Sequence, residues 1–549
     1  MPRSSVADPW TDRWTDLCLV AIFWLIFVVP ALLWGHVSLD GDSLMRLAQV
    51  RDLLHGQNWF DTSQYRMNTP FGLSMHWSRL VDGPIAALIA LSGSERFALT
   101  IWPAFALLAV LAALARIARH LAGQTAMITV LVLGLLAAQL NGLFAPGAID
   151  HHNIQLALML WTLAFLIERR PCATAVTMML SLAIGLESLP YCAVVMAAAS
   201  WWLGNEPARA RAFGFTLAAG ATILLFTTTA AQFRFSPACD SYSLFYAVLL
   251  TAGGAGLGAI SFLPRHKLLA FVALVAALAV LAMLLNPVCL AGPYGGMDPA
   301  LKTIWLSRIS EAHSAFSFAT SAPTEFFGAY VYGCFALAAC FLSPQSRKHW
   351  PLLAMAAMAL LVASFQIRAA PFAIGFALPG LAASLSGLRM VPMIFGLVLG
   401  SNVSFALAGD LIEGSRHQAR DTGFTRQLAC SDEKAMAPLK ALAPGRVAGF
   451  IDQGPAILAY TGDAAIAGPY HRGARGILDS YAIFTGPDPR SVLKARGIDY
   501  VMTCSASPDW QYYRAKGGLI AEIAAHRRPP WLIPSGTAGD VVVYRVAYR

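Results

Sequence analysis

Residues 17–42 read LCLVAIFWLIFVVPALLWGHVSLDGD. The part from Leu17 to Trp34 is apolar, and about twenty such residues are needed for a helix to cross a bilayer core of about 30 Å. It is too long for the apolar core of a secretory signal and lacks a small-residue cleavage site, so we expect a retained membrane anchor. Two carboxylates, Asp40 and Asp42, follow directly beyond this span.

Similar apolar runs recur to about residue 407. The chain has 549 residues, of which 57% are hydrophobic and only 13% are charged, about half the charged fraction of a soluble domain. These features predict a polytopic α-helical membrane protein with about thirteen transmembrane helices. Residues 409–549 are mixed in polarity and predict a soluble α/β domain. No glycine-rich nucleotide loop occurs at a strand–helix junction, which argues against a soluble nucleotide site.

Short loops rich in Lys and Arg indicate the orientation, because such loops stay in the cytoplasm. They occur around residues 116–120, 168–170, 209–211, 265–267, 347–348 and 389, so the net charge of +9 reflects topology rather than nucleic-acid binding. This places the N-terminus in the cytoplasm and residues 409–549 in the periplasm, on the outer side of a cell inner membrane. We predict spans at 17–35, 97–115, 124–143, 152–167, 171–187, 189–204, 212–230, 242–262, 268–286, 325–343, 349–366, 371–386 and 388–408.

Polar clusters gather in the predicted outer loops. We assign residues 1–408 to a transmembrane catalytic domain whose main outer loops are 36–96 and 287–324, and 409–549 to a periplasmic domain. The polar candidates in the outer segments of the transmembrane part are Asp40, Asp42, His76, Trp77, Asp82, Asp150, His151, His152, Glu311, His313 and Arg368.

Carboxylates and a histidine at a membrane surface suit a divalent cation such as Mg²⁺ or Mn²⁺. Such an ion would neutralise a departing phosphate, and a nearby arginine would bind the same oxygens. Taken singly, each residue is more simply a solvated loop residue. Asp150 also fits the N-cap of the following helix, and this role is compatible with metal binding.

The motifs resemble the catalytic subunit of oligosaccharyltransferase and its archaeal and bacterial single-subunit relatives, members of the GT-C class. The similar segments are Asp42 to Asp52, Asn68-Thr-Pro-Phe-Gly72, His76-Trp77, Leu80-Val-Asp82, Gly147-Ala-Ile-Asp150-His-His152 and Arg308-Ile-Ser-Glu311, the last with Arg where the family has Thr.

This resemblance implies thirteen spans, an internal N-terminus and an external C-terminal domain. It also implies that Asp42, Asp150 and His152 bind the metal, with Glu311 as a further catalytic carboxylate. Asp40 is an alternative to Asp42. Arg368 stands where the family places an arginine against the donor phosphate.

The acceptor motif departs from the family. The family's Trp-Trp-Asp-Tyr-Gly, which grips the acceptor sequon, corresponds here to Phe450-Ile451-Asp452-Gln453-Gly454. The resemblance therefore implies a retained donor site and an altered acceptor site. Candidate acceptor residues are Asp452, Gly454, Tyr470, His471 and Arg472, although the last three also fit an ordinary surface loop.

Short segments near 447–452, 464–467, 500–502 and 541–546 predict strands in the C-terminal domain, and 491–496 and 506–525 contain predicted helices. Because the outer compartment is oxidising, we predict a disulfide between Cys430 and Cys504. Cys239 and Cys289, near outer loops, form a second candidate pair.

Together these features predict an inverting, metal-assisted glycosyltransferase. It would move a sugar or glycan from a polyprenyl-(di)phosphate donor to a periplasmic or envelope acceptor, with Asp42, Asp150 and Glu311 as the catalytic carboxylates. One alternative is transfer of a single sugar from a polyprenyl monophosphate to a lipid or envelope glycan. Another is a non-catalytic binder or a transporter of lipid-linked glycan, for which Glu187 is the one candidate charge near a span.

Overall fold

The computed structural model describes residues 9–292, 294–414 and 429–548. The chain divides into two compact units, which we describe separately. The helical unit comprises Met1–Ser38, Ser78–Gly295 and Glu311–Glu413, and the sheet unit comprises Leu39–Trp77, Gly296–Ser310 and Gly414–Arg549.

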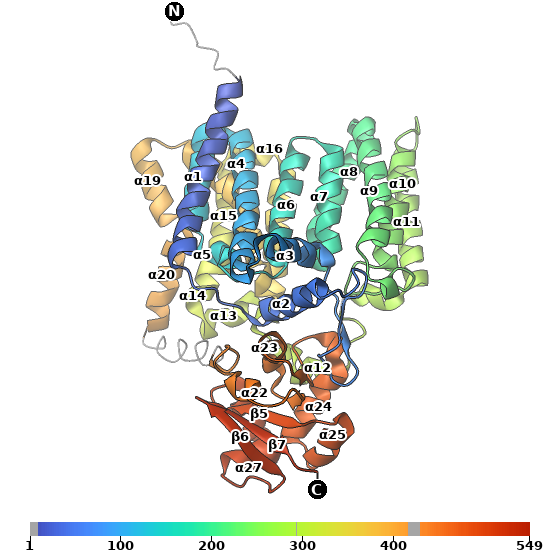
Figure 1. The fold of residues 1–549 in the computed structure, drawn as a ribbon. Helices are drawn as coiled ribbons and strands as arrows, with labels where there is room; N and C mark the ends of the chain where they lie inside the picture. Colours follow the sequence, from blue (N-terminus) through green and yellow to red (C-terminus); the bar gives the residue numbers. More distant parts are fainter. Residues whose placement is uncertain (1–8, 293, 415–428, 549) are drawn as a thin grey trace, which may run out of the picture. The chain divides into compact units, whose positions relative to one another are not determined.

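The helical unit is built from apolar helices that run side by side (Figure 1). The spans predicted from the sequence fall on such helices, except that the span predicted at 388–408 falls on two short helices, Met390–Leu399 and Asn402–Glu413. In the described residues, seven helices are long and apolar enough to cross a membrane, or eight if one bent pair counts as a single span. The chain is therefore a multi-pass membrane protein. The main helices are α1 (Pro9–Trp34), α3 (Arg79–Ser92), α4 (Glu95–Leu135), α6 (His152–Ile167), α7 (Pro171–Ile184), α8 (Leu189–Asn205), α9 (Pro207–Thr227), α10 (Leu244–Ile260), α11 (Lys267–Leu285), α15 (Tyr332–Leu342), α17 (Trp350–Phe365), α18 (Ala370–Ser386), α19 (Met390–Leu399) and α20 (Asn402–Glu413).

Two of these elements are interrupted. The long helix α4 contains non-helical backbone at Ala122 and Gly123, so it corresponds to two of the predicted spans. Helices α19 and α20 are bent by 46° at the break between them. The span predicted at 124–143 is also shorter than expected, since α4 ends at Leu135.

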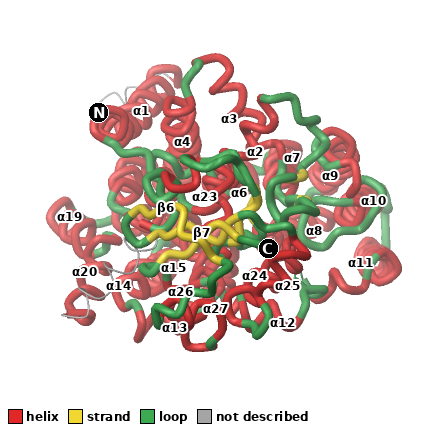
Figure 2. Tube along the Cα trace, turned by 60° about the horizontal axis from the view of Figure 1, so that its bottom comes forward, coloured by secondary structure: helices red, strands yellow, loops and turns green. Residues whose placement is uncertain are grey.

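Side-chain exposure within the helical unit distinguishes core helices from peripheral ones. Most of the apolar stretch in α18 is buried, whereas α11 is almost entirely exposed, with Leu268 at 76% and Leu284 at 78%. Figures 1 and 2 both place α11 at the edge of the unit, next to α10. Because lipid is as apolar as these side chains, an exposed leucine face is the expected surface of a membrane helix.

Helices α9 and α10 pack at very short range. A Cβ atom on Gly214 would lie 2.5 Å from the carbonyl oxygen of Gly254, and one on Gly254 would lie 2.6 Å from that of Gly214. Small residues at facing positions permit such close approach between membrane helices.

Charged contacts gather the basic loops at one end of the helical unit. Arg116 binds both carboxylate oxygens of Glu168, at 2.5 and 2.8 Å, and Arg119 pairs with Asp16 at 2.6 Å. The ring of His120 lies 5.4 Å from that of His349. Loops that the positive-inside rule groups together are therefore close in space.

The sheet unit contains a five-stranded mixed sheet. Its strands are β3 (Arg446–Ala448), β4 (Ala464–Ala465), β5 (Tyr500–Cys504), β6 (Leu532–Ala538) and β7 (Val541–Val546), in the order β4-β3-β5-β7-β6. Strand β3 is parallel to β4 and β5, while β7 is antiparallel to β5 and β6. Figure 2 shows the strands in yellow. The helices of the C-terminal segment are α22 (Ala437–Lys440), α23 (Gly454–Tyr460), α24 (Ala474–Thr485), α25 (Pro489–Arg496), α26 (Pro508–Lys516) and α27 (Gly518–Ala524).

Residues 39–77 belong to this unit. They form α2 (Gly41–Leu54) and a small hairpin of β1 (Ser63–Gln64) and β2 (Leu73–Ser74). The segment after β1 runs beside β4, where Ala465 donates its amide to Arg66 at 2.8 Å and accepts from Thr69 at 3.1 Å. The Arg66 guanidinium donates to the carbonyl of Leu458 at 2.9 Å. Main-chain bonds thus attach the first loop to the sheet.

Two disulfides are formed, and both join cysteines paired in the sequence analysis. Cys430 bonds to Cys504 in the sheet unit, and Cys239 bonds to Cys289 in the helical unit. The Cα atoms lie 5.9 and 4.8 Å apart, within the usual range for a disulfide.

Removing the Cys430–Cys504 bond is expected to lower the free energy of unfolding of the sheet unit by about 2 to 5 kcal/mol, because the bond closes a long loop. The measurement is thermal unfolding of the Cys430→Ser/Cys504→Ser variant. Cys172→Ser, at an exposed free cysteine, is the matched control. An unchanged unfolding midpoint in the double variant would contradict the expectation.

Candidate functional site

The turn at 146–150 brings the Asp150 motif beside the end of α1. The amide of Ser38 donates to the carbonyl of Pro146 at 3.2 Å, and the amide of Gly147 donates to that of Leu99 at 2.9 Å. Gly147 has φ +98°, and a Cβ there would lie 2.2 Å from the Ser38 carbonyl oxygen. Only glycine combines this backbone conformation with this close approach.

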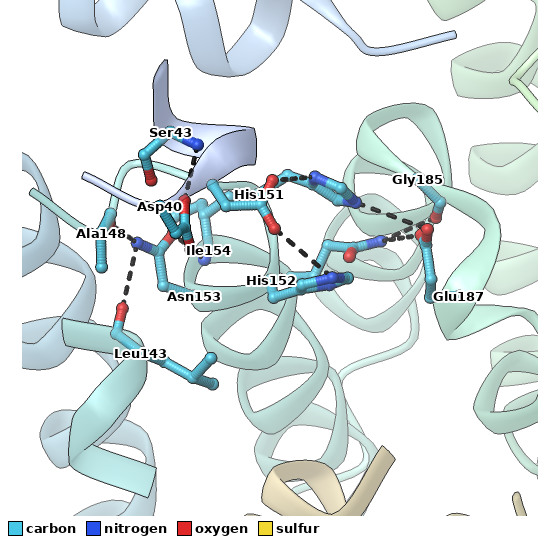
Figure 3. A network of polar contacts seen from close by, with 12 residues as sticks. Asp40, Ser43, Leu143, Ala148, His151, His152, Asn153, Ile154, Gly185 and Glu187 are labelled. Carbon is cyan, nitrogen blue, oxygen red and sulfur yellow. Dashed lines mark hydrogen bonds and ion pairs between the residues drawn. The ribbon is translucent and has the colours of Figure 1, made fainter. Parts of the chain in front are cut away.

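Asp150, His151 and His152, hereafter the Asp150 cluster, form a compact group of possible metal ligands. Their ligand atoms all lie within 4.8 Å of one another. Figure 3 shows His151 and His152. One oxygen of Asp150 lies 2.6 Å from Nδ1 of His151, and the other lies 3.4 Å from Nε2 of His152. The two imidazole rings are 4.4 Å apart. A carboxylate and an imidazole at this separation suit a divalent cation.

Asp150 is not the N-cap of α6, so that alternative is wrong. The capping position is His151, and no side chain caps this helix end. The carboxylate of Asp150 is directed to the two imidazoles instead. Burial disfavours the charged form of His151, but the carboxylates of Asp150 and Glu187 outweigh this and raise the pKa of His151 to about 10.

Glu187 lies on the opposite side of His151, in the short turn η2 (Leu186–Ser188) between α7 and α8. One of its oxygens is 3.5 Å from Nε2 of His151, and the other accepts from the Gln155 amide at 3.2 Å. Glu187 is not among the site residues predicted from the sequence. Its position in an outer turn, on the same predicted side as Asp150, was the available signal.

Arg368 and Glu311 belong to the same unit as the Asp150 cluster. Arg368 lies in η8 (Ile367–Ala369), immediately before α18, and interacts electrostatically with Glu187 and Glu311. Its side chain also bonds to Tyr294 and to Gln366. The amide of Ile367 donates to the carbonyl of His313 at 2.9 Å. The segments that carry Glu311, His313 and Arg368 are therefore neighbours.

Asp82 has a different environment. It lies in the first turn of α3 and pairs with Arg79 at 3.1 Å, with both side chains fully buried. This contact stabilises the start of α3.

Asp40 and Asp42 lie at the start of α2 in the sheet unit. Asp40 is the N-cap, and its carboxylate accepts from the amide of Ser43 at 2.7 Å. Asp42 lies in the first turn of the same helix. Because Asp40 is used as a cap, Asp42 is the better candidate for a metal ligand from this segment, and its approach to Asp150 stays a prediction.

Several other candidates meet within the sheet unit. The rings of His76 and His471 are 5.0 Å apart, and Trp77 packs edge-on against Tyr470 at 5.4 Å. Arg472 donates to the carbonyl of Met75 at 3.2 Å. The 470–472 segment therefore packs against the end of the first loop and is not an independent surface loop.

The altered acceptor motif forms the short turn η10 (Ile451–Gln453) before α23. Phe450 and Ile451, which stand where the family has tryptophans, are buried in the core of the sheet unit. Gly454 is required for packing, since a Cβ there would lie 1.9 Å from the Ala467 carbonyl oxygen. Asp452 is the exposed residue of the turn.

Arg308 is held inside the sheet unit. Its guanidinium pairs with Asp509 at 2.5 Å and lies over the Tyr512 ring at 4.0 Å. Burial raises the pKa of Asp509, although Arg308 opposes this rise. The pKa of Asp452 is also raised. Loss of hydration within the protein is the main cause, and the negative charge of Asp509 adds to it. Arg308, noted only as a departure from the family, thus balances two carboxylates.

Arg308→Met is expected to destabilise the sheet unit by about 3 to 5 kcal/mol at neutral pH, because it leaves the buried carboxylate of Asp509 without its partner. Protonation removes the charge of Asp509, and with it the cost of burying that charge without a partner. The stability lost in Arg308→Met should therefore decrease as pH falls through the raised pKa of Asp509 toward the unfolded value of about 3.9. The measurement is unfolding at several pH values, with Arg308→Met/Asp509→Leu as the control. A deficit independent of pH would contradict this account.

No protein-family model matches the sequence, and no curated protein matches it. Solved structures, in contrast, are similar in fold. One is the archaeal oligosaccharyltransferase AglB from Archaeoglobus fulgidus in complex with an inhibitory peptide and a dolichol-phosphate, with a TM-score of 0.66 and 14% identity. The match covers 98% of this chain and 75% of that one.

Two further structures of the Archaeoglobus fulgidus oligosaccharyltransferase match equally well in sequence, each at 14% identity. The enzyme tethered to an acceptor peptide containing an NVT sequon gives a TM-score of 0.66, covering 98% of this chain and 75% of that one. The complex with zinc and sulfate gives 0.62, covering 96% and 72%. The chain is thus a multi-pass membrane protein with a GT-C fold. In particular, it has the fold of an archaeal oligosaccharyltransferase.

Proposed function

We propose that this protein is an inverting GT-C glycosyltransferase that moves a sugar or glycan from a polyprenyl-(di)phosphate donor to a periplasmic or envelope acceptor. The observation that carries the proposal is the Asp150 cluster, which lies in the same unit as Arg368 and Glu311. The archaeal oligosaccharyltransferase of the same fold was solved with a dolichol-phosphate and with zinc and sulfate.

The donor set of the Asp150 cluster fits a divalent cation such as Mn²⁺ or Mg²⁺, since it combines carboxylate oxygens with imidazole nitrogen. Asp150 and His152 would hold the ion, together with Asp42 from the sheet unit. When bound, the ion supplies Lewis-acid stabilisation of the phosphate leaving group. Arg368 would bind the phosphate oxygens with its planar guanidinium.

In the proposed reaction the acceptor nucleophile attacks the anomeric carbon while the bond to the phosphate oxygen breaks on the opposite face. Glu311 or Asp42 would accept the proton of the nucleophile. Arg368 would neutralise the phosphate that leaves.

The acceptor we propose is not a peptide sequon. Phe450 and Ile451 are buried in the core, so this turn has no exposed aromatic pair to contact a peptide. Asp452 is the exposed polar group of the same turn, with Tyr470, His471 and Arg472 as further candidates. A glycan or lipid acceptor with several hydroxyl groups fits such a polar surface better.

The proposed topology places the multi-pass chain in the cell inner membrane, with its N-terminus in the cytoplasm and residues 409–549 in the periplasm. The convergence of the basic loops at one end of the helical unit supports this orientation.

The test is release of sugar from the host's polyprenyl-linked glycan pool by purified protein. Reactions contain Mn²⁺ or Mg²⁺, or a chelator. We expect release that requires the metal, and the mass of the product would identify the transferred group. Absence of release by folded protein with native lipid would overturn the proposal in favour of a binding or transport role.

A further inference from the structure

Glu187 is a carboxylate that contacts the Asp150 cluster and has no role in the proposed reaction. It lies in the turn η2, between α7 and α8. Its two carboxylate oxygens have different partners. Oε1 lies 3.5 Å from Nε2 of His151, and Oε2 accepts from Nε2 of Gln155 at 3.2 Å. The same Gln155 nitrogen donates to the carbonyl of Gly185 at 2.8 Å.

His151 is held between two carboxylates as a result. Its Nδ1 is 2.6 Å from Asp150, and its Nε2 faces Glu187 (Figure 3). Both ring nitrogens are therefore engaged with protein groups and not directed to a shared metal position. His152 differs, because its Nε2 is 3.4 Å from the second oxygen of Asp150. Asp150 and His152 are thus the pair of the cluster that presents a joint ligand set.

The backbone fits closely around this arrangement. A Cβ atom on Gly185 would lie 2.4 Å from Oε2 of Glu187 and 2.8 Å from Nε2 of Gln155. It would also lie 3.1 Å from Cδ2 of His151. Gly185 has an extended backbone, so the need for glycine here comes from the close approach of these side chains. The contacts of Glu187 are therefore part of a packed structure.

Electrostatic interactions also connect Glu187 to the other residues of the site. Glu187 interacts electrostatically with His152 and Arg368 as well as with His151. Arg368 is the residue proposed to bind the donor phosphate. The Glu187 carboxylate therefore interacts favourably with the guanidinium of Arg368 and with the imidazole of His151.

We propose that Glu187 is a positioning residue for the cation site. It holds His151 by its distal nitrogen, which fixes the orientation of Asp150 and leaves Asp150 and His152 to the ion. This inference rests on the proposed function, because it assumes that the Asp150 cluster binds a divalent cation. Carboxylates that orient a metal site in this way typically change metal affinity by about 10- to 100-fold when removed. It also gives Glu187 a role that does not require a transport path.

The test is Mn²⁺ affinity of the purified full-length protein, measured by electron paramagnetic resonance, with donor turnover as a second readout. Glu187→Gln is expected to raise the dissociation constant for Mn²⁺ by about tenfold or more, and Glu187→Asp, which keeps the charge, by less. Glu95→Gln, which removes a carboxylate from the first turn of α4 in the same unit, is the matched control. Thermal unfolding checks that each variant is folded.

A double variant distinguishes positioning from a general structural effect. If Glu187 acts through His151, Glu187→Gln should add little in a His151→Asn background, whereas independent effects would multiply. Unchanged Mn²⁺ affinity in folded Glu187→Gln, with tight binding by the unmodified protein, would overturn this inference alone. Multiplying effects would overturn it as well. Failure of the unmodified protein to bind Mn²⁺ or release sugar would overturn the proposed function together with this inference.

Discussion

Replacing Asp150 with asparagine is expected to lower glycosyl transfer by about 10³-fold. The substitution keeps the size of the side chain but removes the negative charge that binds the cation, and a catalytic ion contributes several kcal/mol to stabilising the transition state. The Asp150 carboxylate contacts both His151 and His152, so the variant alters the whole Asp150 cluster. The measurement is the rate of sugar release with saturating lipid donor and Mn²⁺.

The matched control for this prediction is Asp488→Asn. Asp488 is the N-cap of α25 in the sheet unit, and asparagine caps a helix about as well as aspartate. This variant should retain full activity. If the transfer rate of Asp150→Asn is within a few fold of that of the unmodified protein, Asp150 is not a catalytic residue and the proposed metal site is wrong.

Gly147→Ala is expected to lower the rate of sugar release by about 10²-fold, although residue 147 carries no functional side chain. A Cβ at this position would lie 2.2 Å from the carbonyl oxygen of Ser38, so the 146–150 turn must move. The φ of +98° adds strain for any L-residue, typically of about 1 to 3 kcal/mol. A displacement of about 1 Å in a catalytic group can cost about 10²-fold in rate.

Gly142→Ala is the matched control, five residues away on the same segment. A Cβ there meets nothing within 4 Å, and the backbone is helical, so activity and stability should be unchanged. The measurements are sugar release and thermal unfolding for both variants. If Gly147→Ala is as active as Gly142→Ala, the turn is not a rigid support for Asp150.

The helical unit was largely predictable because the bilayer imposes length and composition on each span. Apolar runs of fixed length located the helices, and clusters of Arg and Lys located one end of the bundle. What the apolar pattern does not encode is where a helix breaks. The interruption of α4 at Ala122–Gly123 and the 46° bend between α19 and α20 depend on local backbone conformation and packing.

It was harder to predict from the sequence which segments make up the sheet unit. Residues 39–77 are attached to β4 through main-chain hydrogen bonds, such as that between Ala465 and Arg66. Such bonds do not depend on side-chain identity, so the sequence does not predict them. Strand β6 was missed because it contains Pro534 and Gly536, which are tolerated here at the edge of the sheet with an irregularity between them.

The candidate site shows the same contrast. Asp150, His152, Glu311 and Arg368 were proposed because the segments that carry them resemble motifs of a known family. Glu187 was linked only to the transporter alternative, because its contact with His151 depends on how α6 packs against the turn after α7. Arg308 could be identified as unusual, but its partner Asp509 lies about two hundred positions later in the chain and was not predicted.

The most direct test of the account is transfer of labelled sugar from purified polyprenyl-linked donor to an envelope fraction of the host. Unmodified protein is compared with Asp150→Asn, each with Mn²⁺ and with a chelator. We predict that label moves to glycan or lipid that resists proteases, and only with both the metal and Asp150 present. Label in protease-sensitive peptide would contradict the proposed acceptor, and no transfer by folded protein would contradict the proposed enzyme.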